Sequence, residues 1–250
     1  MIELKNSSQL KDMREAGRIT AQALLVAEEA VREGISTKEL DTKIRHFIEK
    51  CGAKPSFLGL YGFPGSACIS VNDQVIHGIP SPDVKLKEGD IVKVDVGAFY
   101  RGFHGDSART YPVGKISDET ARLIEATKLA FYRGFEAVKE GNRIGDIGHA
   151  VESCVKGYGY SVVRRYVGHG VGHDLHEAPD VPNYGTEGRG VRLCRGMVIA
   201  IEPMVNVGTG DVKELSDGWT VLTADGKLSA HYENTVALTD DGPVILTDAN

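Results

Sequence analysis

The sequence predicts an α+β fold in which one domain of 250 residues is built from two like halves. Three observations lead to this expectation. Pairs of helical segments precede runs of short strands, one sequence pattern recurs at a fixed spacing, and no Pro-, Gly- or Ser-rich linker divides the chain. Helices in pairs followed by strands are typical of an antiparallel sheet covered by helices. We expect the halves to comprise residues 1–112 and 113–250.

The helices are predicted from apolar residues that recur at three- and four-residue steps. The first helix is expected over residues 8–33, where Gly34 ends it, and a shorter one over residues 40–48. The second half repeats this arrangement over residues 117–141 and 147–155.

The strands are predicted from short segments rich in β-branched residues. These segments are residues 67–72, 91–100, 106–113, 160–167, 197–206, 219–224 and 229–239.

The two halves repeat each other at an offset of 107 residues. Residues 30–54 match 137–161 in identical residues and apolar spacing, and EGDIVKVDV matches RGMVIAIEP at the same offset, so that Asp95 corresponds to Glu202. If the halves face each other across a twofold axis, these two carboxylates meet near the centre. Like charges in a dry centre are costly unless a cation lies between them.

The composition restricts the protein's partners and setting. The net charge of −6 argues against DNA and anionic membranes as partners. The N-terminal stretch is polar, and the longest apolar runs are far below the ~20 residues that a membrane span needs. The four cysteines form no CxxC pair, so reduced thiols in a cytoplasmic protein are expected.

Four carboxylates lie within strand-like apolar runs, namely Asp95, Asp106, Glu202 and Glu233. Acidic residues are disfavoured in strands, so each of the four is expected to make a specific interaction that accounts for its position. A Gly-containing turn between Asp95 and Asp106 would bring both to one region of a sheet. Four carboxylates and an imidazole suit divalent ions, and four negative charges balance two dications. We therefore expect a dinuclear site that activates a water.

The stretch RYVGHGVGHDLHEAP offers three histidines, His169, His173 and His176. Its glycines argue against a helix, and it is neither an HExxH motif nor a phosphate-binding loop. On the residues alone, several histidines remain candidates for the site, including His176 and His77. His173 and His104 are expected to be exposed or structural.

Seven stretches span nearly the whole chain: MREAGRI, FLGLYGFPGSACISVNDQVIHGIP, EGDIVKVDVG, GFHGDSART, YVGHGVGHDLHEAP, GMVIAIEPMV and DGWTVLTADGKLSAHYENT. On these stretches the chain resembles the type I methionine aminopeptidases of the bacterial short form. The resemblance implies the pita-bread fold, in which two pseudo-symmetric halves form a curved antiparallel sheet around two metal ions.

Carried over by position, the resemblance implies roles for particular residues. The metal ligands would be Asp95, Asp106, His169, Glu202 and Glu233. The catalytic residues would be Glu202 as general base with His77 and His176 as substrate contacts. The pocket for methionine would be formed by Phe57, Leu60, Phe63, Cys68, Leu175 and Trp219. Leu60, Leu175 and Asn234 depart from residues that are commoner in relatives, and this affects the expected shape of the pocket.

The resemblance also implies cofactors and partners. The expected cofactors are two divalent ions (Mn, Fe, Co or Zn), with a monovalent cation near Asn72 and Ser229. The expected substrate is a peptide with a free N-terminal methionine and a small second residue. The resemblance further implies that the protein is a cytoplasmic monomer and that it meets nascent chains at the ribosome.

Two alternatives remain open at this point. A proline-directed peptidase of the same fold would use the same five ligands. A non-catalytic binding module would have lost its metal.

Overall fold

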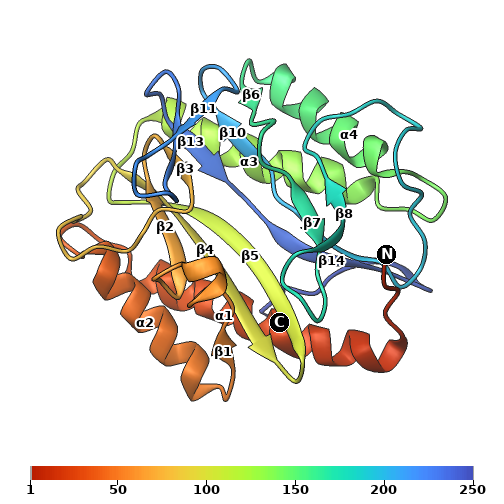
Figure 1. The fold of residues 1–250 in the computed structure, drawn as a ribbon. Coiled ribbons are helices and arrows are strands. Elements are labelled where there is room, and N and C mark those ends of the chain that lie inside the picture. The colour runs from red at the N-terminus through yellow and green to blue at the C-terminus, as the bar shows by residue number, and fades with distance from the viewer. Residues whose placement is uncertain (1, 250) are drawn as a thin grey trace.

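The computed structural model describes residues 2–249, which form four α-helices in two pairs (Figure 1). Helices α1 (Ser7–Ala30) and α2 (Thr37–Lys50) form the first pair, and α3 (Asp118–Glu136) and α4 (Ile144–Gly157) form the second. Side chains cap three of the four helix starts: Asn6 accepts from the backbone at the start of α1, Ser36 at α2 and Ser117 at α3.

The first half contributes a four-stranded antiparallel sheet. Its central strand β4 (Ile91–Tyr100) pairs with β1 (Lys54–Pro55) and β2 (Ala67–Val71) along one edge and with β5 (Phe103–Pro112) along the other. Strands β4 and β5 join through Arg101 and Gly102, whose φ angles of 50° and 88° suit a two-residue hairpin turn.

The second half contributes a five-stranded antiparallel sheet. Its strands, in spatial order, are β15 (Gly242–Ile245), β14 (Asn234–Thr239), β9 (Val198–Ile201), β7 (Gly168–Gly170) and β8 (Glu177–Val181).

Two small sheets complete the fold. One has the order β13 (Ser229–His231), β10 (Met204–Asn206), β6 (Ser161–Val162). The other has the order β11 (Val212–Glu214), β12 (Val221–Thr223), β3 (Gln74–Ile76). The second sheet combines strands from both halves, because β3 precedes β4 in the chain whereas β11 and β12 follow β10.

The predicted repeat is present in the backbone. Helix α4 begins and ends 107 residues after α2. An isolated bridge pairs Ser36 with Lys85 in the first half, and a bridge at the same offset pairs Arg143 with Arg192 in the second. The predicted α+β fold with two pseudo-symmetric halves is therefore confirmed, and helices cover the outer side of each of the two larger sheets (Figure 1).

Strand β4 shows how each sheet separates its two faces. Val92, Val94 and Val96 pack in the apolar core formed with α1 and α2. The alternate residues Lys93 and Asp95 therefore lie on the opposite face, because side chains alternate along a strand. That face looks into the molecule between the two halves, where the site is found.

Several predicted boundaries are corrected by the structure. Of residues 160–167 only Ser161–Val162 form a strand. The segment 197–206 is interrupted after Ile201, where Pro203 lacks the N–H that a ladder needs, and 229–239 is interrupted between His231 and Asn234. The first helix ends at Ala30 and the third at Glu136, before the predicted ends at residues 33 and 141.

Six further strands were not predicted, namely β1, β3, β7, β8, β11 and β15. All of these are two to five residues long. Strand β7 is Gly-His-Gly, whose local preference is for a turn, so its pairing with β8 and β9 decides its conformation.

The four cysteines are free, as expected. No helix within residues 2–249 is long and apolar enough to cross a membrane.

Candidate metal centre and its pocket

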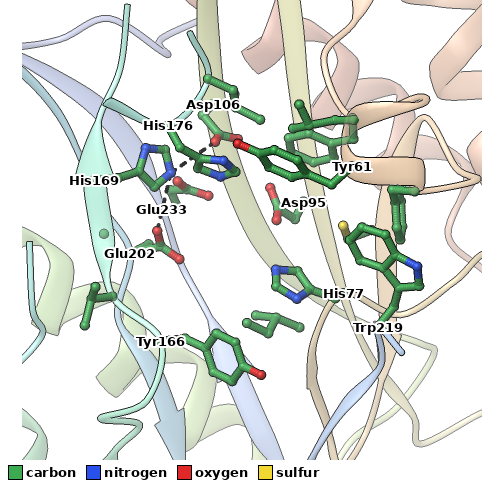
Figure 2. Close-up of a pocket in the computed structure, with 18 of the residues that line it drawn as sticks. Tyr61, His77, Asp95, Asp106, Tyr166, His169, His176, Glu202, Trp219 and Glu233 are labelled. Carbon is green, nitrogen blue, oxygen red and sulfur yellow. Dashed lines mark ion pairs between the residues drawn. The ribbon is translucent and has the colours of Figure 1, made fainter. Parts of the chain in front are cut away.

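A pocket of about 410 Å³ opens between the two sheets, and both halves line it (Figure 2). All five residues proposed as metal ligands lie on its wall: Asp95, Asp106, His169, Glu202 and Glu233. Donor atoms of Asp106, His169 and Glu233 all lie within 4.8 Å of one another. Glu202 Oε1 is 3.7 Å from His169 Nε2, so it adjoins this group.

The two aspartates come from the β4–β5 hairpin. In its register Asp106 lies opposite Gly97, and Asp95 lies opposite Ala108. The two aspartates are therefore diagonal neighbours on one face, as the Gly-containing turn predicted. Asp95 lies in the middle of β4.

A threonine from the second half fixes the backbone of Asp106. The Asp106 N–H donates to Thr235 Oγ1 (3.0 Å), and that hydroxyl donates back to the Asp106 carbonyl (2.9 Å). Glu233 lies between β13 and β14, and its N–H donates to the Ala108 carbonyl (3.0 Å). These bonds join the two halves directly at the site.

The orientation of His169 follows from one hydrogen bond. Its Nδ1 is 2.8 Å from the Gly170 carbonyl, which only accepts, so Nδ1 carries the proton. The Nε2 lone pair is then free, and it lies 3.6 Å from Asp106 Oδ2. This is the tautomer that binds a metal through Nε2.

The four carboxylates of Asp95, Asp106, Glu202 and Glu233, called the acidic group below, repel one another unless a cation lies between them. Burial, followed by the neighbouring carboxylates, raises the pKa of Asp95, Glu202 and Glu233 well above their usual values. Burial raises the pKa of Asp106 to about 7, opposed by the Ser107 backbone N–H. Burial lowers the pKa of His169 to about 4, and His176 adds to this effect. The neutral imidazole and the crowded carboxylates both favour a bound cation.

Two oxygens of the group support this interpretation. Asp95 Oδ1 and Asp106 Oδ1 are buried and have no hydrogen-bond partner. Asp106 and Glu202 contact the imidazoles of His169 and His231, and within residues 2–249 none of the four carboxylates pairs with a lysine or arginine. Oxygen-rich ligands with one imidazole suit divalent ions such as Mn, Fe, Co and Zn. The donor set therefore fits divalent metal.

Two more histidines face the centre. The His176 ring lies 4.4 Å from the His169 ring at 81°, and burial lowers the pKa of His176. His77 follows β3 with a φ of 58°, and burial lowers its pKa to about 4. Both are expected to be neutral at pH 7, and both line the pocket (Figure 2).

The other end of the pocket is apolar. All six residues predicted for it come together there, with Leu60 and Trp219 packed against the buried Phe57, Phe63, Cys68 and Leu175. The Trp219 ring meets Phe63 edge-on at 5.1 Å. Burial and the neighbouring carboxylates raise the pKa of the Cys68 thiol, which therefore remains protonated.

His104 and His173 are absent from the pocket wall, as expected. His104 Nδ1 lies 2.9 Å from Ser56 Oγ, and His173 Nδ1 lies 2.8 Å from the Gly102 carbonyl. His173 is exposed.

Three residues around the site were not predicted from the sequence. Tyr61 is 77 % exposed at the pocket, with its ring stacked 6.2 Å from that of His176. Tyr166 meets His77 edge-on at 5.7 Å. His231 is buried beside Glu202, with Nε2 3.6 Å from Oε2, and neither of its ring nitrogens has a hydrogen-bond partner. His231 alternates with Glu233 in the sequence, and this spacing was the available signal.

Asn72 and Ser229 lie together, as the resemblance implied. The Ser229 N–H donates to the Asn72 carbonyl (3.2 Å). The same carbonyl accepts from Lys93 Nζ at 2.6 Å. The monovalent cation expected here stays a prediction, and the structure places a lysine at this point.

Comparison with known proteins agrees with this geometry. Residues 11–240 match Metallopeptidase family M24. A methionine aminopeptidase from Clostridium perfringens is 56% identical over 247 residues, covering 99% of each chain.

Solved structures extend the comparison. The methionine aminopeptidase from Rickettsia prowazekii superimposes with a TM-score of 0.97 at 41% identity, covering 99% of this chain and 100% of that one. The prolidase from Pyrococcus furiosus has a TM-score of 0.79 at 26% identity, covering 99% of this chain but 66% of that one.

Proposed function

The chain belongs to metallopeptidase family M24, where it groups with methionine aminopeptidases, and on this premise we propose that it removes N-terminal methionine from peptides and proteins. One observation carries the proposal. Four carboxylates, of which Asp106 and Glu233 are buried and Asp95 and Glu202 partly buried, converge with the Nε2 atom of His169 at the end of an apolar pocket lined by Trp219, Phe63 and Cys68.

The proposed ligands of two divalent ions are Asp95, Asp106, His169, Glu202 and Glu233. Four carboxylates balance the charge of two dications, and this supports a dinuclear centre. The bound ions would supply Lewis-acid activation of the attacking water. Mn, Fe, Co and Zn all suit this donor set.

Glu202 is the proposed general base, because its two carboxylate oxygens lie beside His169 and His231. It accepts a proton from the attacking water and passes it toward the leaving amine. His77 and His176, both neutral, donate hydrogen bonds to the tetrahedral oxyanion or to the scissile nitrogen. The substrate's free, unprotonated N-terminal amine would also be held by the bound ions, which would restrict action to chain ends.

The apolar end supports methionine as the first residue. A flexible thioether packs well against aromatic edges such as those of Trp219 and Phe63. Tyr61 and His176 stand together on the pocket wall, and this supports a preference for a small second residue. We propose that the whole chain, residues 1–250, acts as one catalytic unit, a cytoplasmic monomer that meets its substrates as they leave the ribosome.

A peptide panel tests the proposal. Met-Ala-Ser, Met-Trp-Ser and an X-Pro dipeptide are offered to protein reconstituted with each of Mn, Fe, Co and Zn, and the bound metal is measured alongside. We expect cleavage of Met-Ala-Ser with two ions per chain and little cleavage of the others. Preferred X-Pro hydrolysis would establish the proline-directed alternative. Absence of both metal binding and cleavage would establish a non-catalytic binding module.

A further inference from the structure

Lys93 is among the largest fully buried side chains of the protein, with 1 % of its surface exposed. It lies on β4 two residues before Asp95, on the face that looks between the halves. Burying a lysine is costly unless its charge and its donors are satisfied. A lysine at this position therefore needs a specific partner.

The partner is a backbone carbonyl. Lys93 Nζ donates to the Asn72 carbonyl at 2.6 Å, a short distance that suits a charged donor. Within residues 2–249, no carboxylate lies at ion-pair distance from this ammonium. Burial lowers the pKa of Lys93 to about 7, and the charges of Asp73 and Asp90 oppose this by favouring the ammonium. Asp90 already accepts from the Asn72 side chain and from the Lys87 N–H.

The Asn72 carbonyl joins three parts of the fold. Asn72 forms the turn between β2 and β3 with a φ of 51°, and β3 leads directly to His77. The same carbonyl accepts from the Ser229 N–H at the start of β13, the strand that precedes Glu233. Lys93 supplies the third part, β4. One carbonyl thus holds segments that lead to His77, Glu233 and Asp95.

We propose that the Lys93 ammonium is a built-in monovalent cation that holds the β2–β3 turn and strand β13 against β4. Lys93 is in this sense a positioning residue for the pocket. A buried positive charge that rests on a main-chain carbonyl, with no carboxylate partner, has the same chemistry as a bound K⁺ or Na⁺. Because the charge is tethered to β4, the protein needs no free monovalent ion at this place. The inference concerns the framework and does not depend on which peptide is cleaved.

The test compares two variants that remove the charge in different ways. Lys93→Ala leaves room beside the Asn72 carbonyl, whereas Lys93→Met fills most of that room with an uncharged chain. Each is reconstituted with Mn²⁺ beside the wild type. The melting temperature and the cleavage rate for a Met-Ala peptide are measured in KCl, NaCl and choline chloride at equal ionic strength. Lys128→Ala, an exposed change on α3, is the control.

We expect the wild type and the control to behave alike in all three salts. Lys93→Ala should melt roughly 4–8 °C lower in choline, because a buried carbonyl loses a donor. K⁺ or Na⁺ should restore its melting temperature and its rate in a saturable manner. Lys93→Met should be impaired equally in every salt, because no ion can enter.

Three results would overturn the inference. One is a Lys93→Ala variant as stable in choline as the wild type. Another is a Lys93→Ala variant that responds to the three salts just as Lys93→Met does. The third is a wild type that K⁺ or Na⁺ stabilises saturably over choline. The third measurement decides the matter even if Lys93→Ala fails to fold in every salt.

Discussion

Cys68 lies directly opposite Asp95 in the β2–β4 ladder, so the apolar end of the pocket and the acidic group meet at one cross-strand pair. Paired residues in an antiparallel ladder project on the same face. The predicted methionine pocket therefore ends where the predicted metal ligands begin. A side chain held against Cys68 would present its own backbone to the carboxylates, as an enzyme acting on the first peptide bond requires.

Replacing His169 with alanine should abolish both metal binding and turnover. The Nε2 atom of His169 lies 3.6 Å from Asp106 Oδ2, and alanine offers no donor there. Metal content and the rate for Met-Ala-Ser are measured on the same sample. The matched control is His173→Ala, four residues on, whose exposed ring contacts the Gly102 carbonyl, Glu3 and Phe103 and lies away from the pocket wall. Full activity of His169→Ala with two bound ions would disprove its role as a ligand.

Replacing His77 with alanine should lower kcat by about 10²–10⁴-fold while leaving the metal content intact. His77 lines the pocket as a neutral imidazole, but it is not among the three residues whose donor atoms lie within 4.8 Å of one another. Kinetics over a range of Met-Ala-Ser concentrations separate kcat from KM. Loss of metal from this variant would show that a ligand has been mistaken for a substrate contact.

Methionine should change the fluorescence of the protein, because the chain's one tryptophan, Trp219, lines the apolar end of the pocket. A titration with methionine or norleucine should give a saturable change, and lysine should give none. The Trp219→Phe variant, which keeps an aromatic ring against Phe63, is the control for signals that arise elsewhere. If methionine inhibits cleavage without any spectral change, the pocket has been placed wrongly.

Metal-free protein should lose stability as the pH rises through the acidic group's titration. Burial raises the folded-state pKa of Asp106 to about 7, above its unfolded value near 4. The folded state then binds this proton more tightly, so the contribution of Asp106 to stability is greatest below pH 4 and is lost between pH 4 and 7. Metal-free Asp106→Asn should therefore melt above metal-free wild type at pH 8 and match it at pH 4.

The comparison of the two proteins cancels the opposite effect of the buried histidines, which both share. Adding Mn²⁺ at pH 8 should reverse the order, because the variant has lost a ligand. A metal-free Asp106→Asn protein that melts below wild type at pH 8 would contradict the proposed repulsion among the carboxylates.

Arg109→Lys should loosen the segment that carries Glu233. The Arg109 guanidinium donates to the Glu233 carbonyl (2.6 Å) and to Asn234 Oδ1 (2.8 Å), and it lies 4.1 Å from the Tyr232 ring centre. Lysine cannot reproduce this planar set of contacts. A lower melting temperature and weaker Mn²⁺ binding are expected. Arg122→Lys, which changes an exposed arginine stacked on Tyr158, should leave both unchanged.

Much of the fold followed from local pattern. The offset of 107 residues relates the bounds of α4 to those of α2, because the two halves have the same helix spacing and the same turns, although both helices extend beyond the predicted residues 40–48 and 147–155. The strict alternation in VKVDVG carried one further signal that the sequence analysis did not use. It places Lys93 on the same face as Asp95, since alternate residues of a strand share a face.

The sequence pattern by itself determined the pseudo-symmetric α+β fold and singled out the four carboxylates, whereas the aromatic residues of the pocket were proposed from the family resemblance. Only the tertiary structure decided where strands break, which histidine turns its Nε2 inward, and that Lys93, His231 and Tyr61 adjoin the site. The physical reason is that periodicity reports which face of an element is apolar. The partner of a buried polar atom comes from segments distant in the chain, as when Asn72 meets Lys93 and Ser229.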